Sequence, residues 1–498
     1  MDNKRQSGLL LHITSLPSKW GSGDFGLQAF NFIDFLSKSS QKIWQVLPLN
    51  AVSSEYKFSP YSPTSVFALN DLLISPEKLI ESGLINRNHI NSGIYAGQKA
   101  DFVFSATVKR HFIQSALENE LVLKDNNYLH FQEKNREWLF DFALFRALKR
   151  HFGHKRSWIS WPLGLVQREK NSIDNWKKKL SREIIFETFS QFLAHTQWQE
   201  LKNYAHQNGV QIMGDLPFYP AFESSDVWAN QKLFRLNDKG EPLYISGAPP
   251  DYFSTDGQLW NTPVYFWPAH RENKYTWWMS RIQKNTELYD FLRLDHFRGF
   301  CAYWQVPAGE KNAKNGKWIP APGKSFINKL LKIFKDYIFI AEDLGEITPD
   351  VIRIKEQHGL PGMHVLQFAF GPDMSVSPHV PHNHKHKNIV YTGTHDNNTV
   401  LGWYMNETGR RVRKRLRDYA AKRITKKDVA NHLIRLAMAS VADTAIIPVQ
   451  DILNLDGSGR MNTPAGKKEN WVWRLAPGQL QDEHMCYLNE ICRLYGRN

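Results

Sequence analysis

Cysteines and long apolar runs are scarce in this 498-residue chain. Its three cysteines, Cys301, Cys486 and Cys492, form no C-x-x-C pair, and their odd number argues against a disulfide framework or a zinc site. The apolar run Leu9–Leu11 near the start is interrupted by His12, so we expect neither a secretory leader nor a membrane span. These absences predict a cytoplasmic protein.

Extended blocks of basic residues are few, although the formal net charge is +14. An excess of basic residues raises the question of a nucleic-acid partner. The basic residues are spread along the chain, however, and the densest run, Arg410–Arg417, reads as the solvated side of a helix. We therefore expect no nucleic-acid partner. The sequence also contains no short internal repeat and no low-complexity tract.

Short apolar stretches that read as strands recur along the chain, mostly with helical patterns between them. They cover residues 8–17, 42–49, 210–217, 291–295, 337–345, 362–370, 388–396 and 445–453. Eight strands with helices between them predict an α/β fold, a (β/α)8 TIM barrel. The 45 residues after 453 are too few for a C-terminal β-sandwich.

Long segments interrupt the strand–helix alternation at three places, and we expect them to be largely helical insertions in a single catalytic domain, 1–498. The first covers 51–180, after the second strand. The second, 218–284, follows the third strand and carries the Gly/Pro-rich loop 247–255. A smaller insertion, 300–336, follows the fourth strand.

Acidic residues follow five of the predicted strands. They are Asp215, Asp295, Glu342, Asp396 and Asp451. Catalytic groups of such barrels lie at the C-terminal ends of the strands, so we expect these acids to meet at one mouth. Side chains alternate along a strand, which places Arg293 on the same face as Asp295. We expect the guanidinium to lower the pKa of Asp295 and to keep this carboxylate ionised.

Two chemistries could use a cluster of acids. A divalent metal ion takes oxygen ligands, but the adjacent Glu342 and Asp343 would point in opposite directions. The histidine-rich segment 379–386 reads as a solvated loop, so we predict no metal site there. Glycosyl transfer needs a nucleophilic carboxylate and a carboxylic acid about 5 Å apart, and aromatic faces on which sugars stack. Trp260, in a Gly/Pro-rich setting, is a candidate for such a face.

Three acid-bearing motifs resemble those of the α-amylase clan of glycoside hydrolases. They are Arg293-Leu-Asp295, Ala341-Glu-Asp-Leu-Gly345 and Gly393-Thr-His-Asp-Asn-Asn398. More closely, the chain resembles the amylomaltases, which are the 4-α-glucanotransferases of glycoside hydrolase family 77. The motifs that carry this resemblance include Leu10-Leu-His-Ile-Thr-Ser-Leu-Pro17, Gly214-Asp-Leu-Pro217, Gly257-Gln-Leu-Trp260 and Arg460-Met-Asn-Thr-Pro464. The resemblance runs in order from about residue 8 to 475.

The resemblance implies transfer of α-1,4-glucan segments between maltooligosaccharides, with no cofactor. Asp295 would be the nucleophile, Glu342 the acid and base, and Asp396 the carboxylate that holds the sugar hydroxyls. The implied substrate-binding residues are Tyr61, which would stack on the sugar, and Asp215, Gln258, Trp260, Arg293, His296, His395 and Asn462. A retaining α-glucan hydrolase of the same clan remains the alternative, although the missing β-sandwich favours the transferase. A glycan-binding barrel without activity is a further alternative.

Overall fold

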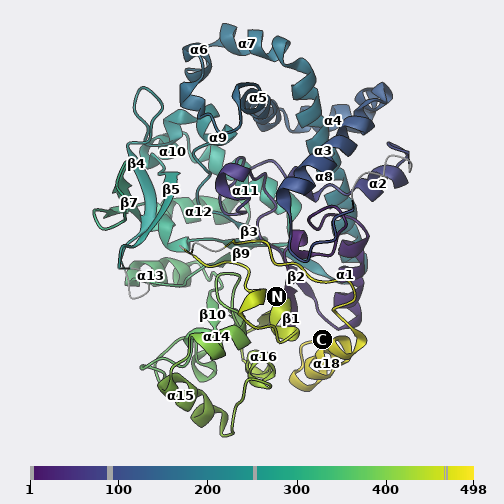
Figure 1. The fold of residues 1–498 in the computed structure, drawn as a ribbon. Coiled ribbons are helices and arrows are strands. Elements are labelled where there is room, and N and C mark those ends of the chain that lie inside the picture. The colour runs from purple at the N-terminus through teal and green to yellow at the C-terminus, as the bar shows by residue number, and fades with distance from the viewer. Residues whose placement is uncertain (1–4, 87–93, 251–254, 465, 467–468) are drawn as a thin grey trace.

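The computed structural model describes residues 5–86, 94–250, 255–464, 466 and 469–498, and its centre is a parallel sheet of eight strands (Figure 1). In chain order, the strands are β1 (Gln6–Leu10), β2 (Ile43–Gln45), β3 (Gln211–Leu216), β6 (Phe291–Leu294), β9 (Ile338–Ala341), β10 (Met363–Val365), β11 (Ile389–Tyr391) and β12 (Thr444–Pro448). Every hydrogen-bonded neighbour is parallel: each strand pairs with the next one in this series except β9 with β10, and β12 pairs back with β1. The predicted (β/α)8 barrel is therefore confirmed, with strands shorter than the apolar stretches.

The sheet curls until its two edge strands, β9 and β10, face each other across a seam. No β-ladder joins β9 and β10 among the described residues. Instead, the amide of Ala341 donates to the carbonyl of Pro361 at 2.8 Å, and the amide of Met363 donates to the carboxylate of Asp343 at 2.7 Å. The barrel closes here through a side chain as well as through the main chain.

Helices fill the segment between β2 and β3. They are α2 (Pro76–Glu81), α3 (Phe102–Leu117), α4 (Asn126–Lys134), α5 (Arg136–Phe152), α6 (Leu163–Val166), α7 (Lys170–Lys179) and α8 (Ser181–Gln207). The long helix α8 runs back to β3, and its buried residues Phe189, Leu193 and Trp198 join the main hydrophobic core. Figure 1 shows α5, α6 and α7 at the top, on the far side of the barrel strands from α14, α15 and α16.

The chain between β3 and β9 forms a second sheet, which we did not predict from the sequence. Its four antiparallel strands follow the order β5-β4-β7-β8. They are β4 (Tyr244–Ala248), β5 (Gln258–Pro263), β7 (Ala302–Pro307) and β8 (Lys317–Pro320). The same region holds α9 (Ser225–Ala229), α10 (Trp267–Glu272), α11 (Thr276–Leu288) and α12 (Gly323–Ile333). In the sequence, the barrel strand β6 lies between β4 and β7, which pair with each other. The second sheet therefore joins the segments 218–284 and 300–336, which we had treated as separate insertions.

The remaining helices follow β1, β9, β11 and β12 in the chain. They are α1 (Leu27–Lys38), α13 (Pro349–Gln357), α14 (Val400–Asn406), α15 (Arg410–Ala420), α16 (Val429–Ala439), α17 (Val449–Ile452) and α18 (Asp482–Tyr495). After Pro448 the described residues, which leave out 465 and 467–468, contain no strand, in line with the predicted absence of a β-sandwich. In α15 only Leu416 is buried, as expected for a solvated basic helix. All three cysteines are free thiols. Among the described helices, none combines the length and apolar character that a membrane span requires.

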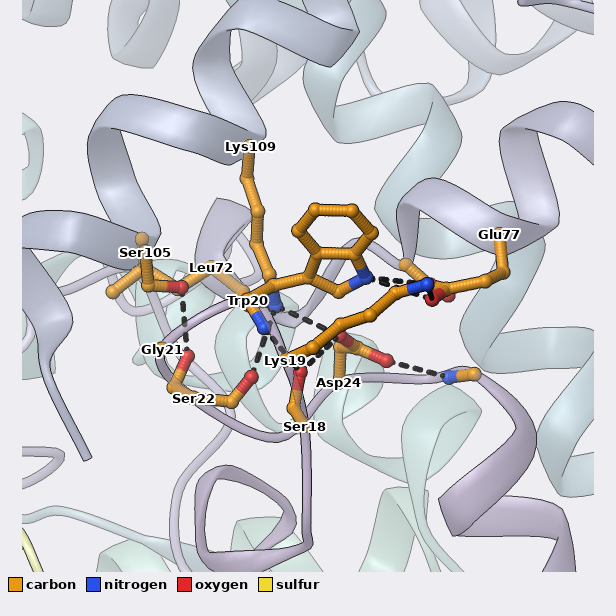
Figure 2. Close-up of polar contacts among 12 residues, drawn as sticks. Ser18, Lys19, Trp20, Gly21, Ser22, Asp24, Leu72, Glu77, Ser105 and Lys109 are labelled. Atoms are coloured by element: carbon orange, nitrogen blue, oxygen red, sulfur yellow. Dashed lines mark hydrogen bonds and ion pairs between the residues drawn. The ribbon is translucent and has the colours of Figure 1, made fainter. Parts of the chain in front are cut away.

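A buried ion pair ties helix α3 to the loop that follows β1. Figure 2 shows Lys109 pointing into this loop, where its ammonium donates to the carboxylate of Asp24 at 3.0 Å. The ammonium also donates to the carbonyl of Leu72, which follows β2, at 2.6 Å. The side chains of Lys109 and Asp24 are only 1% and 9% exposed. Burial raises the pKa of Asp24, and the lysine opposes this rise. Each charge therefore depends on the other, since neither is solvated by water.

Removing one partner of this pair should destabilise the whole protein. We expect Lys109→Met to lower the free energy of unfolding by about 3–5 kcal/mol, because Asp24 would keep a buried charge with no cation beside it. Urea unfolding followed by tryptophan fluorescence measures this loss. Lys414→Met, which breaks the exposed ion pair with Asp418, is the matched control and should shift the midpoint little. Equal shifts of the urea midpoint in both variants would contradict a stabilising role for the buried ion pair.

Candidate active site

Two neighbouring strands hold an arginine between two carboxylates at the barrel mouth. Arg293 on β6 stands opposite Asp215 on β3 in the strand register. The Nη1 atom of Arg293 lies 2.6 Å from Asp215 Oδ2 and 3.0 Å from Asp295 Oδ1. The alternation along β6 thus places Arg293 and Asp295 together, as predicted. Asp215 is fully buried, so in this structure it supports Arg293 from beneath the site surface.

The ionisation of Asp295 differs from the expectation in its net direction. The pKa of Asp295 is raised to about 6. Burial raises it most, Arg293 lowers it, and the carboxylates of Asp215 and Asp396 raise it further. Arg293 does lower the pKa of Asp295, as predicted, but it does not set the net direction of the shift. The reason is that desolvation and two further negative charges outweigh one shared guanidinium. Asp295 is still ionised at neutral pH.

Glu342 follows β9 directly and enters the same mouth. Its amide donates to the carbonyl of Leu294 at 3.2 Å, which continues the pairing of β9 with β6. Burial raises the pKa of Glu342 to about 8; Arg293 opposes this rise, and Asp295, Asp343 and Asp396 add to it. A carboxyl group with this pKa is mostly protonated at neutral pH and can donate a proton.

Asp396 lies in the turn after β11 and is held by residues from two segments. Its Oδ1 atom accepts from the Nδ2 of Asn462 at 2.5 Å, and its Oδ2 lies 3.4 Å from the Nε2 of His395. Arg460 donates to the main-chain carbonyl of Asp396 at 2.8 Å. Asp396 still keeps 45% of its side chain exposed, so its carboxylate can reach a ligand.

An aromatic stack stands beside these carboxylates. The rings of Tyr61 and His395 are parallel within 10°, with centroids 4.8 Å apart, and Trp471 packs against both. The hydroxyl of Tyr61 donates to Asp215 Oδ2 at 2.6 Å. Burial lowers the pKa of His395, so this ring is neutral at neutral pH. One face of Tyr61 thus packs against His395, whereas we had expected Tyr61 simply to stack on a sugar.

The second sheet brings a further aromatic group to the site. Trp260 on β5 packs edge-on against His296, with ring centroids 4.8 Å apart, and its Nε1 donates to the Oε1 of Gln258 at 3.3 Å. His296 adopts a left-handed backbone conformation, with φ of 48°, directly after Asp295. Burial lowers the pKa of His296 to about 4. Within the described part of the chain, its buried Nε2 has no hydrogen-bond partner. Residues 251–254 of the predicted loop 247–255 lie outside the described residues.

The expectation that Asp451 would lie with the other acids at the barrel mouth is wrong. Asp451 does not join the cluster, because the strand ends at Pro448 and Asp451 lies buried in α17. Its carboxylate accepts from the hydroxyl of Thr392 and the amide of Val400, which is a structural role. The histidine-rich segment 379–386, which we expected to be a solvated loop, is only partly solvated. His384 is buried, and its ring stacks on that of His364 with centroids 4.3 Å apart.

Several groups around the site were not identified from the sequence alone. Trp471 and Arg460 were given no role, and Asp343 was weighed only as a poor metal ligand. Their contacts join segments far apart in the chain, so spacing could not reveal them. In the part of the chain that the structure describes, no group of three His, Cys, Asp or Glu side chains is placed to hold a metal ion.

The arrangement suits chemistry at a glycosidic bond. An ionised carboxylate, a protonated carboxyl group and a third, accessible carboxylate come from β6, β9 and β11 of one barrel. Displacement at an anomeric carbon needs the first two as nucleophile and acid. The fold and these side chains together indicate an enzyme that cleaves or transfers sugars.

Comparisons with known proteins agree with this class. A model of the 4-alpha-glucanotransferase family matches residues 11–481. The 4-alpha-glucanotransferase of Aquifex aeolicus is 42% identical over 500 residues, covering 99% of each chain. The enzyme of the same name from Synechocystis sp. is 42% identical over 507 residues, covering 100% of this chain and 99% of its own. A solved amylomaltase from Streptococcus agalactiae, in complex with acarbose, has a TM-score of 0.94 at 35% identity, covering 99% of this chain and all of its own.

The family model spans nearly the whole chain, and the similarity to the two bacterial enzymes is equally complete. The chain therefore belongs to the 4-alpha-glucanotransferase family.

Proposed function

We propose that this enzyme transfers α-1,4-glucan segments from a donor to an acceptor maltooligosaccharide by a retaining double displacement. Family membership supports the reaction class. The observation that carries the assignment of roles is electrostatic: burial and the nearby carboxylates of Asp295 and Asp396 raise the pKa of Glu342 to about 8, whereas the pKa of Asp295 rises only to about 6. One carboxylate and one carboxylic acid therefore coexist at neutral pH.

In the first step, a carboxylate oxygen of Asp295 attacks the anomeric carbon of the donor glucan. As this bond forms, the glycosidic C–O bond breaks, and Glu342 gives its proton to the departing 4-oxygen. The reducing-end fragment leaves as a free sugar. The transferred segment stays bound to Asp295 as a β-linked ester, and Glu342 is now ionised.

In the second step, the 4-hydroxyl of an acceptor glucan attacks the same anomeric carbon. Glu342, now a base, takes the proton of this hydroxyl, and the ester bond to Asp295 breaks. Two inversions restore the α configuration, and both carboxyl groups return to their starting states. Every proton is accounted for within the protein and the two sugars.

Asp396 and its neighbours would grip the sugar at the point of reaction. The carboxylate is held by Asn462 and His395, so it presents fixed acceptors to the hydroxyls of the glucose ring. Such contacts contribute most when they strengthen as the ring flattens in the transition state. Tyr61, fixed by Asp215 and His395, would pack against the same ring.

Transfer rather than hydrolysis requires that an acceptor sugar take the place of water. Trp260 and Gln258 on β5, together with His296, are our candidates for the acceptor platform. The Nε2 of His296, which has no partner among the described residues, is our candidate for a bond to a sugar hydroxyl, and the indole of Trp260 can stack on a ring. The loop 247–255 is the candidate lid in this proposal. The three free thiols suit a reducing compartment, so a cytoplasmic location is part of the proposal.

Maltotriose as sole substrate tests the proposed reaction. We expect glucose together with a ladder of maltodextrins longer than the substrate, because each released glucose leaves a maltosyl group for another chain. Thin-layer or anion-exchange chromatography resolves this ladder. Products limited to glucose and maltose would establish the retaining hydrolase instead. Binding of maltotriose without turnover would establish a glycan-binding barrel.

A further inference from the structure

The seam of the barrel lies directly beside the acid Glu342, and one largely buried side chain helps to close it. Asp343 accepts a hydrogen bond from the amide of Met363 on β10 through Oδ1, at 2.7 Å. Its Oδ2 lies 2.5 Å from the ammonium of Lys355 on α13. The side chains of Asp343 and Lys355 are only 11% and 17% exposed. Asp343 thus joins the end of β9 to the next strand and to the next helix.

The main chain around Gly362 is shaped to admit this ion pair. A Cβ atom at Gly362 would lie 2.5 Å from Asp343 Oδ2 and 2.7 Å from Lys355 Nζ, so a side chain at this position would push the ion pair aside. The amide of Gly362 donates to the side-chain carbonyl of Asn388 at 2.9 Å, just before β11. The main chain at the start of β10 and the side chain just before β11 thus both help to place the contact between Asp343 and β10.

Glu342 is fixed from two sides as a result. Its own amide bonds to Leu294 on β6, while the next side chain in the sequence bonds to β10. The other seven strand neighbours are held by β-ladders, whereas β9 and β10 lack one in the described chain. Loss of the Asp343 contact would leave only main-chain bonds to hold the end of β9, at the point where the acid must meet the glycosidic oxygen.

We propose that Asp343, paired with Lys355, is a positioning residue of the transfer reaction, which closes the seam between β9 and β10 and thereby holds Glu342 against the reacting oxygen. This inference rests on the proposed role of Glu342 as acid and base. Asp343 acts through its neighbour and touches no substrate in this account. A displacement of about 1 Å in a reacting group can cost on the order of 10²-fold in rate.

Charge supplies a readout that a purely structural role would not move. Glu342 is faced by Arg293 and Asp295 from β6, by Asp396 from the turn after β11 and by its neighbour Asp343, while Lys355 faces Asp343 from α13. The negative charge of Asp343 raises the pKa of Glu342. The rate should fall at high pH as Glu342 loses its proton, and we call this fall the basic limb of the profile.

The experiment compares variants of the full chain over a range of pH, with maltotriose as substrate. Asp343→Ala should lower kcat by about 10²-fold with little change in KM, because the acid is displaced but the sugar still binds. Asp343→Asn keeps a side-chain oxygen for the Met363 amide and removes the charge. It should therefore lose less kcat, and its basic limb should move to lower pH. Glu346→Gln removes one exposed acid from the same segment and should leave both kcat and the basic limb unchanged.

A second variant keeps the test decisive if Asp343→Asn fails to fold. Lys355→Met leaves the charge of Asp343 without its cation, so its basic limb should move to higher pH, opposite to Asp343→Asn. Basic limbs that coincide with the wild type in both Asp343→Asn and Lys355→Met would overturn the inference. Glu342→Gln separates this result from a failure of the proposed function. If it keeps full activity with maltotriose, the acid is misassigned. If it is inactive while the Asp343 variants behave as wild type, only the present inference fails.

Discussion

Asp295→Ala is expected to reduce transfer from maltotriose by on the order of 10⁴-fold or more, the largest loss in the protein. The side chain supplies the oxygen that bonds to the anomeric carbon, and its neighbours cannot replace it. Arg293 carries no nucleophile, and Asp215 is buried beneath it. Initial rates of glucose release measure the loss. Asp238→Ala, which removes an exposed acid outside the barrel mouth, is the matched control and should retain full activity.

Azide can test whether the loss comes from a missing nucleophile. The shortened side chain leaves space on the face of the sugar that Asp295 normally attacks. With α-maltosyl fluoride as donor, azide should enter this space, displace fluoride and give a β-maltosyl azide, with partial recovery of turnover. An azide product of α configuration, or an Asp295→Ala variant with substantial activity on maltotriose, would contradict the assignment.

Glu342→Gln is expected to lower transfer from maltotriose by about 10²- to 10⁴-fold, the range for removal of a general acid and base. Fluoride leaves without needing a proton, so the first step with α-maltosyl fluoride should be far less affected. Stopped-time assays with the two donors measure this difference. Equal losses with both donors would contradict proton transfer by Glu342, because the variant would then have lost binding or folding instead.

The same two groups set the expected pH dependence of the wild-type enzyme. Attack requires ionised Asp295, so activity should decline as pH falls below about 6. Departure of the sugar requires protonated Glu342, so activity should decline as pH rises above about 8. The profile of kcat/KM should therefore be bell-shaped, with limbs that belong to the interacting carboxylates together. With α-maltosyl fluoride, the basic limb of the first step should disappear.

The barrel and the positions of its acids could be predicted because each signal is local. An apolar stretch that stops at a charged residue marks a strand end, as in Leu294 followed by Asp295, and parallel strands place such ends together. Asp451 broke the pattern for a reason visible in the sequence: Pro448 ends the strand three residues earlier, and α17 begins at Val449.

The second sheet could not be predicted, because its strands carry little alternation and pair across long separations. The segment Tyr244–Ala248 contains Ser246 and Gly247, and its partner β7 begins nearly sixty residues later, beyond β6. Strand tendency depends on such partners more than on the segment itself. This sheet carries Trp260 to His296, so the acceptor side of the site was less accessible to sequence reasoning than the acids were.

Ionisation could be predicted only in part, because burial does not appear in a sequence. The pairing of Arg293 with Asp295 followed from alternation, but the desolvation that outweighs it requires the packed barrel. The stacking of Tyr61 on His395 likewise depends on a contact between residues 61 and 395.

Mass spectrometry of a trapped intermediate tests the central claim most directly. Glu342→Gln incubated with α-maltosyl fluoride should accumulate a glycosyl-enzyme, because the second step lacks the base that activates the acceptor. Proteolysis at low pH should then place two added glucose units on the peptide that contains Asp295. An adduct on any other residue, or rapid turnover to α-linked products without any adduct, would contradict the double displacement at Asp295.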